Sequence, residues 1–264
     1  MALTLDGMPV IDDSNWKLHA SMAQHLSTGR VARNYNAVPF GALPGAAPFT
    51  LKLIPRSEWS DRIKERKERG AMVSDLLLRK GIPPKNQGQT NYCWTNGVVT
   101  ALETVRAVAN LPYIELSPAS VAAPIKNFQN VGGWGGEALD YIIKNGIAPV
   151  ADWPANAINR QYDNAMSRAS RVKNIVTEWW DMPNRSFDAK MTCLLLGLPV
   201  PSGYNWWSHE TCGIDPVEIE AGHFGSVERN SWGPSYGNQG FFVLAESKST
   251  PDDAVCPAVV SAAA

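Results

Sequence analysis

The chain has 264 residues, of which 44% are apolar and 19% are charged, a composition that suits one domain of moderate size with a sizeable buried core. The formal net charge of -1 excludes a general electrostatic attraction to nucleic acid or to an anionic membrane. No apolar run approaches the roughly 20 residues that span a bilayer, and the first residues lack the basic and apolar regions of a secretory signal. We therefore expect no nucleic-acid partner and no membrane partner.

The four cysteines, Cys93, Cys193, Cys212 and Cys256, form no CxxC pair. Zinc-finger spacing is absent, and four cysteines in a chain of this length do not indicate a disulfide scaffold. The sequence predicts no metal site and no cofactor. Together with the missing signal, this cysteine usage favours a reducing location, either cytoplasmic or associated with a particle.

The first predicted element is an arm. Residues 1–50 are rich in Ala, Gly, Pro and Asn without sustained periodicity, which predicts an extended arm or linker. Residues 58–80 carry a run of mixed charge that is typical of a solvated helix. After Cys93, apolar residues recur at three- and four-residue steps and predict a buried helix. A second helix is predicted over residues 137–144, ended by Asn145-Gly146.

Beyond residue 170 the pattern changes to short apolar runs separated by turns. Strands are expected over residues 193–200, 209–215, 224–230 and 240–245. Helices first and strands later predict an α+β architecture. The last segment, residues 247–264, is Ala-rich and is predicted to form a C-terminal tail, which leaves residues 51–246 as the folded domain.

Cys93 is the candidate nucleophile because it directly precedes a predicted helix. The positive end of a helix dipole lowers a thiol pKa, and only the thiolate attacks. The alternative is a small buried hydrophobic residue, the usual role of a free cysteine. That alternative is strongly preferred for Cys193 and Cys212, which lie in apolar strand segments, while Cys256 is expected in the tail.

Two histidines compete for the role of base, and hairpin geometry separates them. If residues 209–215 and 224–230 pair as antiparallel strands joined by residues 216–222, His209 lies beside Asn230. His223 would lie at the far end of the hairpin, more than about 20 Å from Asn230 at roughly 3.3 Å per residue. His209 is therefore the predicted base.

Several motifs resemble the papain-like cysteine peptidases over about residues 54–244. These are Lys85-Asn86-Gln87-Gly88 followed by Cys93-Trp94, Gly133-Trp134-Gly135-Gly136 followed by the predicted second helix, Asp152-Trp153-Pro154, and Asn230-Ser231-Trp232-Gly233. The resemblance implies a papain-like fold, in which a helical half carries the nucleophile and an antiparallel β-sheet half carries His and Asn.

The resemblance also assigns roles to individual residues. Cys93 would be the nucleophile, His209 the base, Asn230 the residue that orients the imidazole, and Gln87 a donor to the oxyanion. In addition, the resemblance implies substrate binding. Gly135 and Gly136 would offer their backbone to an extended peptide by strand addition, and Trp232 would cover the His–Asn hydrogen bond and line the site.

Three features depart from the family pattern. Thr90 and Gly133 stand where secreted members carry a disulfide, which supports a reducing setting. Tyr92 replaces a small residue before the nucleophile and is expected to narrow the substrate groove. The segment 199–209 is short, and the arm lacks the long helical pattern of the family's inhibitory propeptides, so a conventional secreted zymogen is not expected.

Two functions follow from these observations. The first is a cysteine peptidase that hydrolyses peptide bonds of a peptide or protein substrate through a Cys-His-Asn triad and an acyl-enzyme intermediate. The alternative is a structural or binding protein on the same scaffold, such as a component of a virus particle, whose N-terminal arm engages an assembly partner. The presence of all four functional side chains favours the peptidase.

Overall fold

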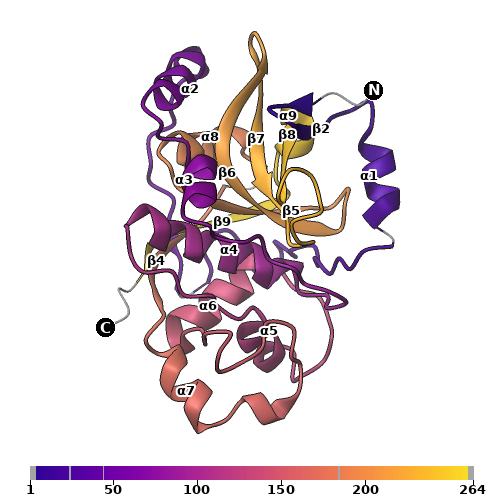
Figure 1. Ribbon diagram of the computed structural model, residues 1–264, viewed down its shortest axis with the longest axis vertical. Helices are drawn as coiled ribbons and strands as arrows, with labels where there is room; N and C mark the ends of the chain where they lie inside the picture. The colour runs from indigo at the N-terminus through magenta and orange to yellow at the C-terminus, as the bar shows by residue number, and fades with distance from the viewer. Residues whose placement is uncertain (1–3, 24, 44, 184, 261–264) are drawn as a thin grey trace.

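A computed structural model describes residues 4–23, 25–43, 45–183 and 185–260, and it divides into a helical half and a sheet half (Figure 1). The central helix α4 (Cys93–Val108) lies between the two halves and packs on strand β6 (His209–Glu220). Almost every side chain of α4 is buried, because one of its faces contacts helices and the other contacts the sheet. The expected α+β architecture is confirmed.

The helical half gathers four helices around an apolar cluster that contains Trp94, Leu102, Leu139 and Trp153. Its elements are α4, α5 (Ala119–Ile125), α6 (Gly135–Asn145), the 3-10 turn Arg160–Tyr162 and α7 (Ala165–Arg171). Helix α6 ends at Gly146, whose φ of 75° is left-handed, as the sequence predicted.

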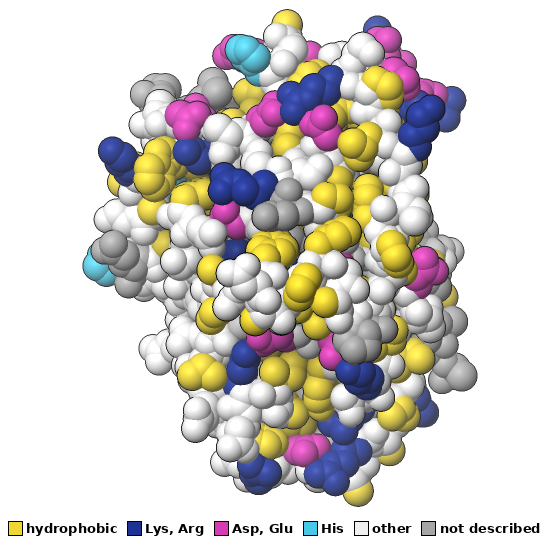
Figure 2. All heavy atoms as spheres, turned by 180° about the vertical axis from the view of Figure 1, so that it is seen from behind, with side chains coloured by type: hydrophobic (Ala, Val, Ile, Leu, Met, Phe, Trp, Pro, Cys, Tyr) yellow, Lys and Arg dark blue, Asp and Glu magenta, His cyan; other side chains and the backbone are white. Residues whose placement is uncertain are grey.

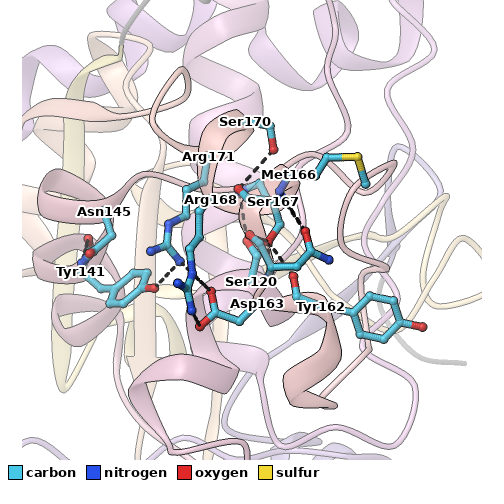
Figure 3. Close-up of polar contacts among 12 residues, drawn as sticks. Ser120, Tyr141, Asn145, Tyr162, Asp163, Met166, Ser167, Arg168, Ser170 and Arg171 are labelled. Carbon is cyan, nitrogen blue, oxygen red and sulfur yellow. Dashed lines mark hydrogen bonds and ion pairs between the residues drawn. The ribbon is translucent and has the colours of Figure 1, made fainter.

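Helix α7 is held on the helical half by polar contacts (Figure 3). Asn164 caps its first turn by accepting from the backbone N–H groups of Met166 and Ser167. The Arg171 guanidinium reaches Tyr141 of α6, donating to its hydroxyl at 3.0 Å. Helix α7 lies on the opposite side of α6 from the sheet (Figure 1). These contacts therefore stabilise the outer part of the helical half and have a structural role.

The sheet half contains nine strands in the order β1-β2-β8-β7-β6-β5-β9-β4-β3 within the described residues. The later strands are β4 (Val176–Asp181), β5 (Val200–Tyr204), β6, β7 (His223–Arg229), β8 (Phe241–Ala245) and β9 (Asp253–Val260). These strands pair antiparallel with one another. The helices of this half are α2 (Trp59–Glu68) after the 3-10 turn Arg56–Glu58, α3 (Val73–Arg79), α8 (Phe187–Leu195) and the short α9 (Glu246–Ser249).

The predicted arm is part of the fold rather than a free extension. It contains β1 (Thr4–Leu5), β2 (Met8–Ile11), α1 (Trp16–Ala23) and β3 (Ala47–Pro48). Strands β1 and β3 lie at the two ends of the sheet; β2 pairs antiparallel with β1 and parallel with β8, and β3 pairs parallel with β4. Because Val10 and Ile11 are fully buried against the sheet, the arm contributes to the core.

Three local predictions are wrong. The predicted tail forms α9 and β9, and β9 lies inside the sheet between β5 and β4, so Cys256 is buried. Cys193 belongs to helix α8, because the strand predicted there begins only at Val200. The connection predicted over residues 216–222 is mostly strand, because β6 continues to Glu220 and the hairpin turns tightly at Gly222.

The face opposite the view of Figure 1 carries charges of both signs (Figure 2). They interleave over the exposed surface of α2, where Arg62 pairs with Glu58 and Arg69 with Glu65 at i,i+4 spacing. This agrees with the solvated helix that the mixed-charge run predicted. No helix within the described ranges is both long and apolar enough to cross a membrane.

Candidate active site

The β6–β7 hairpin brings His209 beside Asn230. The ring Nε2 of His209 lies 2.8 Å from Oδ1 of Asn230, and the same oxygen accepts the backbone N–H of Ser231 at 2.8 Å. A backbone N–H can only donate, so the amide atom that faces the imidazole is the oxygen. In the neutral ring, Nε2 therefore carries the proton and donates to Asn230, which leaves the lone pair on Nδ1 available to accept one.

Trp232 covers this pair. Its ring stacks on the imidazole with centroids 4.4 Å apart and an interplanar angle of 21°. His209 and Asn230 are completely buried. Burial lowers the pKa of His209 to about 4, although the hydrogen bond to Asn230 acts in the opposite direction. The imidazole is thus neutral at pH 7, the protonation state that a general base requires.

Cys93 is the first residue of α4, as the sequence predicted. Its thiol lies against the backbone N–H groups of Trp94 and Glu210, the residue after His209, and both lower its pKa. Burial and the nearby Glu210 carboxyl outweigh them and raise the pKa of the thiol far above its ordinary value. Across the described residues, Nδ1 of His209 has no hydrogen-bond partner. The thiol thus contacts the backbone of the residue that follows His209, it is not hydrogen-bonded to the imidazole in this conformation, and both groups are neutral.

Gln87 lies in the loop before α4, and its side-chain amide is fully buried. Its Oε1 accepts from the Ser231 hydroxyl at 2.6 Å, which ties the nucleophile loop to the loop that carries Asn230. Its Nε2 donates to the backbone oxygens of Thr90 at 2.8 Å and Ser27 at 3.0 Å. The donor that the resemblance assigned to an oxyanion is thus already bound to a peptide carbonyl of the arm.

The arm runs between the two halves (Figure 1) and hydrogen-bonds to both of them. The segment of residues 27–31, here called the groove segment, pairs with Gly133: Val31 N–H donates to the Gly133 oxygen at 2.8 Å, and Gly133 N–H donates to the Gly29 oxygen at 3.0 Å. On its other side, Arg30 N–H donates to the Ser208 oxygen at 3.2 Å. The groove segment therefore occupies the site in the manner of an extended peptide.

Two buried arginines anchor the arm. Arg30 of the groove segment pairs with Asp253 of β9, and both side chains are at most 3% exposed. Arg33 forms a two-pronged ion pair with Asp181 of β4, at 2.5 and 2.7 Å, and lies over the ring of Trp134. Gly29, with a φ of 137°, passes so close to the backbone of Asn91 that a Cβ atom would not fit. The docked arm thus takes the backbone groups of Gly133 and Ser208 that another extended chain would need.

Two of the proposed substrate-binding residues are placed differently from expectation. Gly135 and Gly136 begin α6 and are buried, and the N–H of Gly135 donates to the Glu210 carboxyl at 3.0 Å. The strand-like pairing falls instead on Gly133, because the chain turns into the helix immediately after Trp134. The prediction for Gly135 and Gly136 is therefore wrong.

Tyr92 does not narrow the groove. It is fully buried in the helical half, its ring meets Trp94 edge-on at 6.4 Å, and its hydroxyl donates to the Gln129 oxygen at 2.8 Å. The loop before α4 is held by Asn130, which accepts from Asn91 N–H at 2.6 Å and donates to the Gln89 oxygen at 3.1 Å. All four cysteines are free.

Sequence reasoning missed three buried ionisable residues of the site, Arg30, Asp253 and Glu210. Asp253 lies in the segment taken for a tail, and Arg30 lies in the segment taken for a linker. The only sign of Arg30 and Asp253 in the sequence was a charged side chain in a segment that contains many small or apolar residues.

The low pKa of His209 has a measurable consequence for stability. The unfolded chain binds a proton near the ordinary pKa of 6.5, whereas the folded chain binds it only near about 4. Acidification from pH 7 to pH 4 should therefore destabilise the wild type by about 3 kcal/mol more than His209→Gln. Denaturant unfolding of both proteins at each pH measures the difference. Identical pH dependence would contradict the buried neutral ring.

Comparison with known proteins places this geometry in a class. No family model matches the chain. Among curated proteins, it is 27% identical over 181 residues to the oryzain beta chain of Oryza sativa subsp. japonica, covering 60% of this chain and 38% of that protein. It is also 24% identical over 252 residues to pro-cathepsin H of Bos taurus, covering 85% of this chain and 68% of the relative.

Solved structures agree with this comparison. The fold matches procathepsin L 3 of the Tenebrio molitor larval midgut with a TM-score of 0.63 at 16% identity, over 93% of this chain and 88% of that one. It matches xylellain, a cysteine protease from Xylella fastidiosa, with a TM-score of 0.60 at 16% identity, over 88% and 96% of the two chains. The chain has the papain-like fold, and it is a divergent relative of the papain-like cysteine proteases. The resemblance seen in the sequence is confirmed.

Proposed function

We propose that the chain is a cysteine peptidase whose groove segment keeps it latent in the conformation described above. The observation that carries the proposal is the orientation of the imidazole: Asn230 holds the proton on Nε2, Nδ1 is left without a hydrogen-bond partner among the described residues, and the thiol of Cys93 contacts the backbone of the next residue, Glu210. This is the arrangement that a thiol needs from its base. The cysteine proteases among the relatives support the same class of reaction.

The proposed reaction has two stages. When the groove segment has left, Nδ1 of His209 takes the thiol proton, and the sulfur of Cys93 forms a bond to the carbonyl carbon of the peptide. The negative charge on the carbonyl oxygen is stabilised by Nε2 of Gln87 and the backbone N–H of Cys93. His209 then returns its proton to the leaving amine as the C–N bond breaks, which gives an acyl-enzyme.

Water completes the cycle. His209 removes a proton from a water molecule, whose oxygen attacks the thioester carbon, and the C–S bond breaks. The sulfur regains the proton from the imidazolium and the carboxylic acid leaves. Asn230 keeps Nδ1 as the free nitrogen during both proton transfers, because its hydrogen bond to Nε2 persists.

The chain spans less than two fifths of the length of the oryzain relative. The substrate and partners proposed below are therefore argued from the residues of this chain and not from that relative.

The second candidate function is a structural or binding protein on the same scaffold. The full burial of Cys93 under a docked arm favours it. In this case the arm would be a permanent part of the fold, and an assembly partner would bind elsewhere. A cytoplasmic or particle-associated location remains a prediction under both functions.

Labelling with a peptidyl electrophile, read by mass spectrometry, distinguishes the two functions. A peptidase should be modified at Cys93 at least about tenfold faster than at Cys212, which is equally buried and whose pKa is likewise raised by burial. The labelling should disappear in His209→Gln. Equal labelling of the two cysteines, also after the groove segment is loosened by Arg30→Glu, would support the structural function.

A further inference from the structure

The groove segment carries one side chain into a deep pocket of the sheet half. Arg30 is the residue bridged to Gly133, and its side chain is only 2% exposed. One guanidinium nitrogen donates to Oδ1 of Asn205 and another to Oδ2 of Asp253. The pocket thus binds a guanidinium group through two acceptors on different elements.

The walls of this pocket are built around that group. Asp253 begins β9, Asn205 follows β5, and Gly203 of β5 forms the floor between them. A Cβ atom at Gly203 would collide with Arg30 and come within 2.8 Å of the Asp253 carboxylate. The missing side chain at position 203 therefore makes the room that the guanidinium fills.

A second carboxyl group lies close to the guanidinium of Arg30. Glu210 is completely buried, and its Oε1 has no hydrogen-bond partner among the described residues, while Oε2 accepts from Gly135 N–H. Burial and the neighbouring Asp253 raise the pKa of Glu210, and Arg30 acts against this rise. If Arg30 were removed, two buried carboxyl groups would face the space it leaves. Such a space favours a cation over a neutral or acidic side chain.

We propose that this pocket selects an arginine side chain in the substrate, at the residue that pairs with Gly133. The inference rests on the proposed function, because it assigns the arm's binding mode to a substrate that replaces it. A peptide that adds to Gly133 as a strand places one side chain where Arg30 now lies. Arginine fits better than lysine, because its planar fork reaches Asn205 and Asp253 together.

The first test measures hydrolysis of peptides that differ only at the residue proposed to pair with Gly133. Arginine should exceed its neutral isostere citrulline by about 10²-fold in kcat/KM, with lysine between them. Asp253→Asn should reduce the arginine preference below about tenfold. Asp252→Asn is the matched control, because Asp252 accepts the backbone N–H of Asn205 and not the guanidinium, so it should keep the preference. Active enzyme without an arginine preference would overturn the inference and leave the proposed function standing.

The second test needs no turnover. Arg30→Ala opens a hole of the size of N-ethylguanidinium, which at millimolar concentration should raise the unfolding temperature of this variant by about 2–4 °C. Wild type, Arg30→Ala/Asp253→Asn, and N-ethylurea added to Arg30→Ala should show no rise. A rise in a chain that hydrolyses nothing would support the pocket and count against the peptidase, whereas no rise in folded Arg30→Ala would overturn the pocket.

If Arg30→Ala does not fold, the inference can be tested with the wild-type protein. Paired electrophiles with arginine or citrulline at the same position should then modify Cys93 at rates that differ by about tenfold or more. Equal rates would overturn the inference.

Discussion

Replacing His209 with alanine is expected to lower kcat/KM for peptide hydrolysis about 10²–10⁴-fold, the usual contribution of a positioned general base. The reason is the lone pair on Nδ1, which in the proposed mechanism takes the thiol proton because Asn230 fixes the other nitrogen as the donor. Without the imidazole, the proposed mechanism has no base for the thiol, whose pKa is raised by burial. The rate should be measured both in the wild-type background and in Arg30→Glu, where the groove is expected to be open.

His223→Ala is the matched control for this prediction. His223 lies at the far end of the same hairpin, pairs in register with Glu220, and has a side chain that is 77% exposed. Its loss should leave kcat/KM unchanged within about twofold, because it touches no part of the site. If both variants retained the wild-type rate, His209 would not be the base and the proposed mechanism would be wrong.

Arg30→Glu is expected to accelerate both Cys93 alkylation and peptide hydrolysis by about 10²–10³-fold. The substitution breaks a buried ion pair and faces Asp253 and Glu210 with a third carboxyl group. Breaking such a pair costs about 3–5 kcal/mol, which converts to at least about a 10²-fold larger population with an open groove. Iodoacetamide kinetics at Cys93, followed by mass spectrometry, measure the opening directly.

Arg56→Glu provides the comparison for Arg30→Glu. Arg56 also pairs with carboxylates, those of Asp188 and Glu246, but its side chain is 50% exposed. Exposed pairs contribute little to stability, so alkylation of Cys93 should stay near the wild-type rate. Thermal unfolding shows whether each variant is folded. A folded Arg30→Glu with unchanged Cys93 reactivity would mean that the groove segment does not control access.

The docked arm keeps both Cys93 and His209 in their neutral forms. Under the docked groove segment, burial raises the pKa of Cys93 and lowers that of His209, so neither group is charged at neutral pH. Access of water would reduce both shifts, because each arises mainly from burial. Departure of the arm is therefore expected to expose the nucleophile and to favour the thiolate–imidazolium pair at the same time.

Local patterns were sufficient for the elements that carry the site. The apolar stripe after Cys93 predicted α4, and the two apolar runs around residues 209–230 predicted the hairpin that places His209 beside Asn230. Both depend on interactions between residues close in sequence, which periodicity reports. The full length of β6 was not predicted, because Pro216 was taken to begin the turn. In the structure Pro216 pairs with Ser226 within the strand.

The sequence by itself determined the α+β class, the helix that presents Cys93 and the pairing of His209 with Asn230. Tertiary structure alone decided that residues 27–31 fill the groove, that Gly133 rather than Gly135 pairs with an extended chain, and that Asp253 meets Arg30. These contacts join residues more than 100 positions apart along the chain. The arm and the last strand have weak local conformational preferences, and their conformation is set by contacts with distant segments of the folded chain. Local sequence patterns therefore do not predict them.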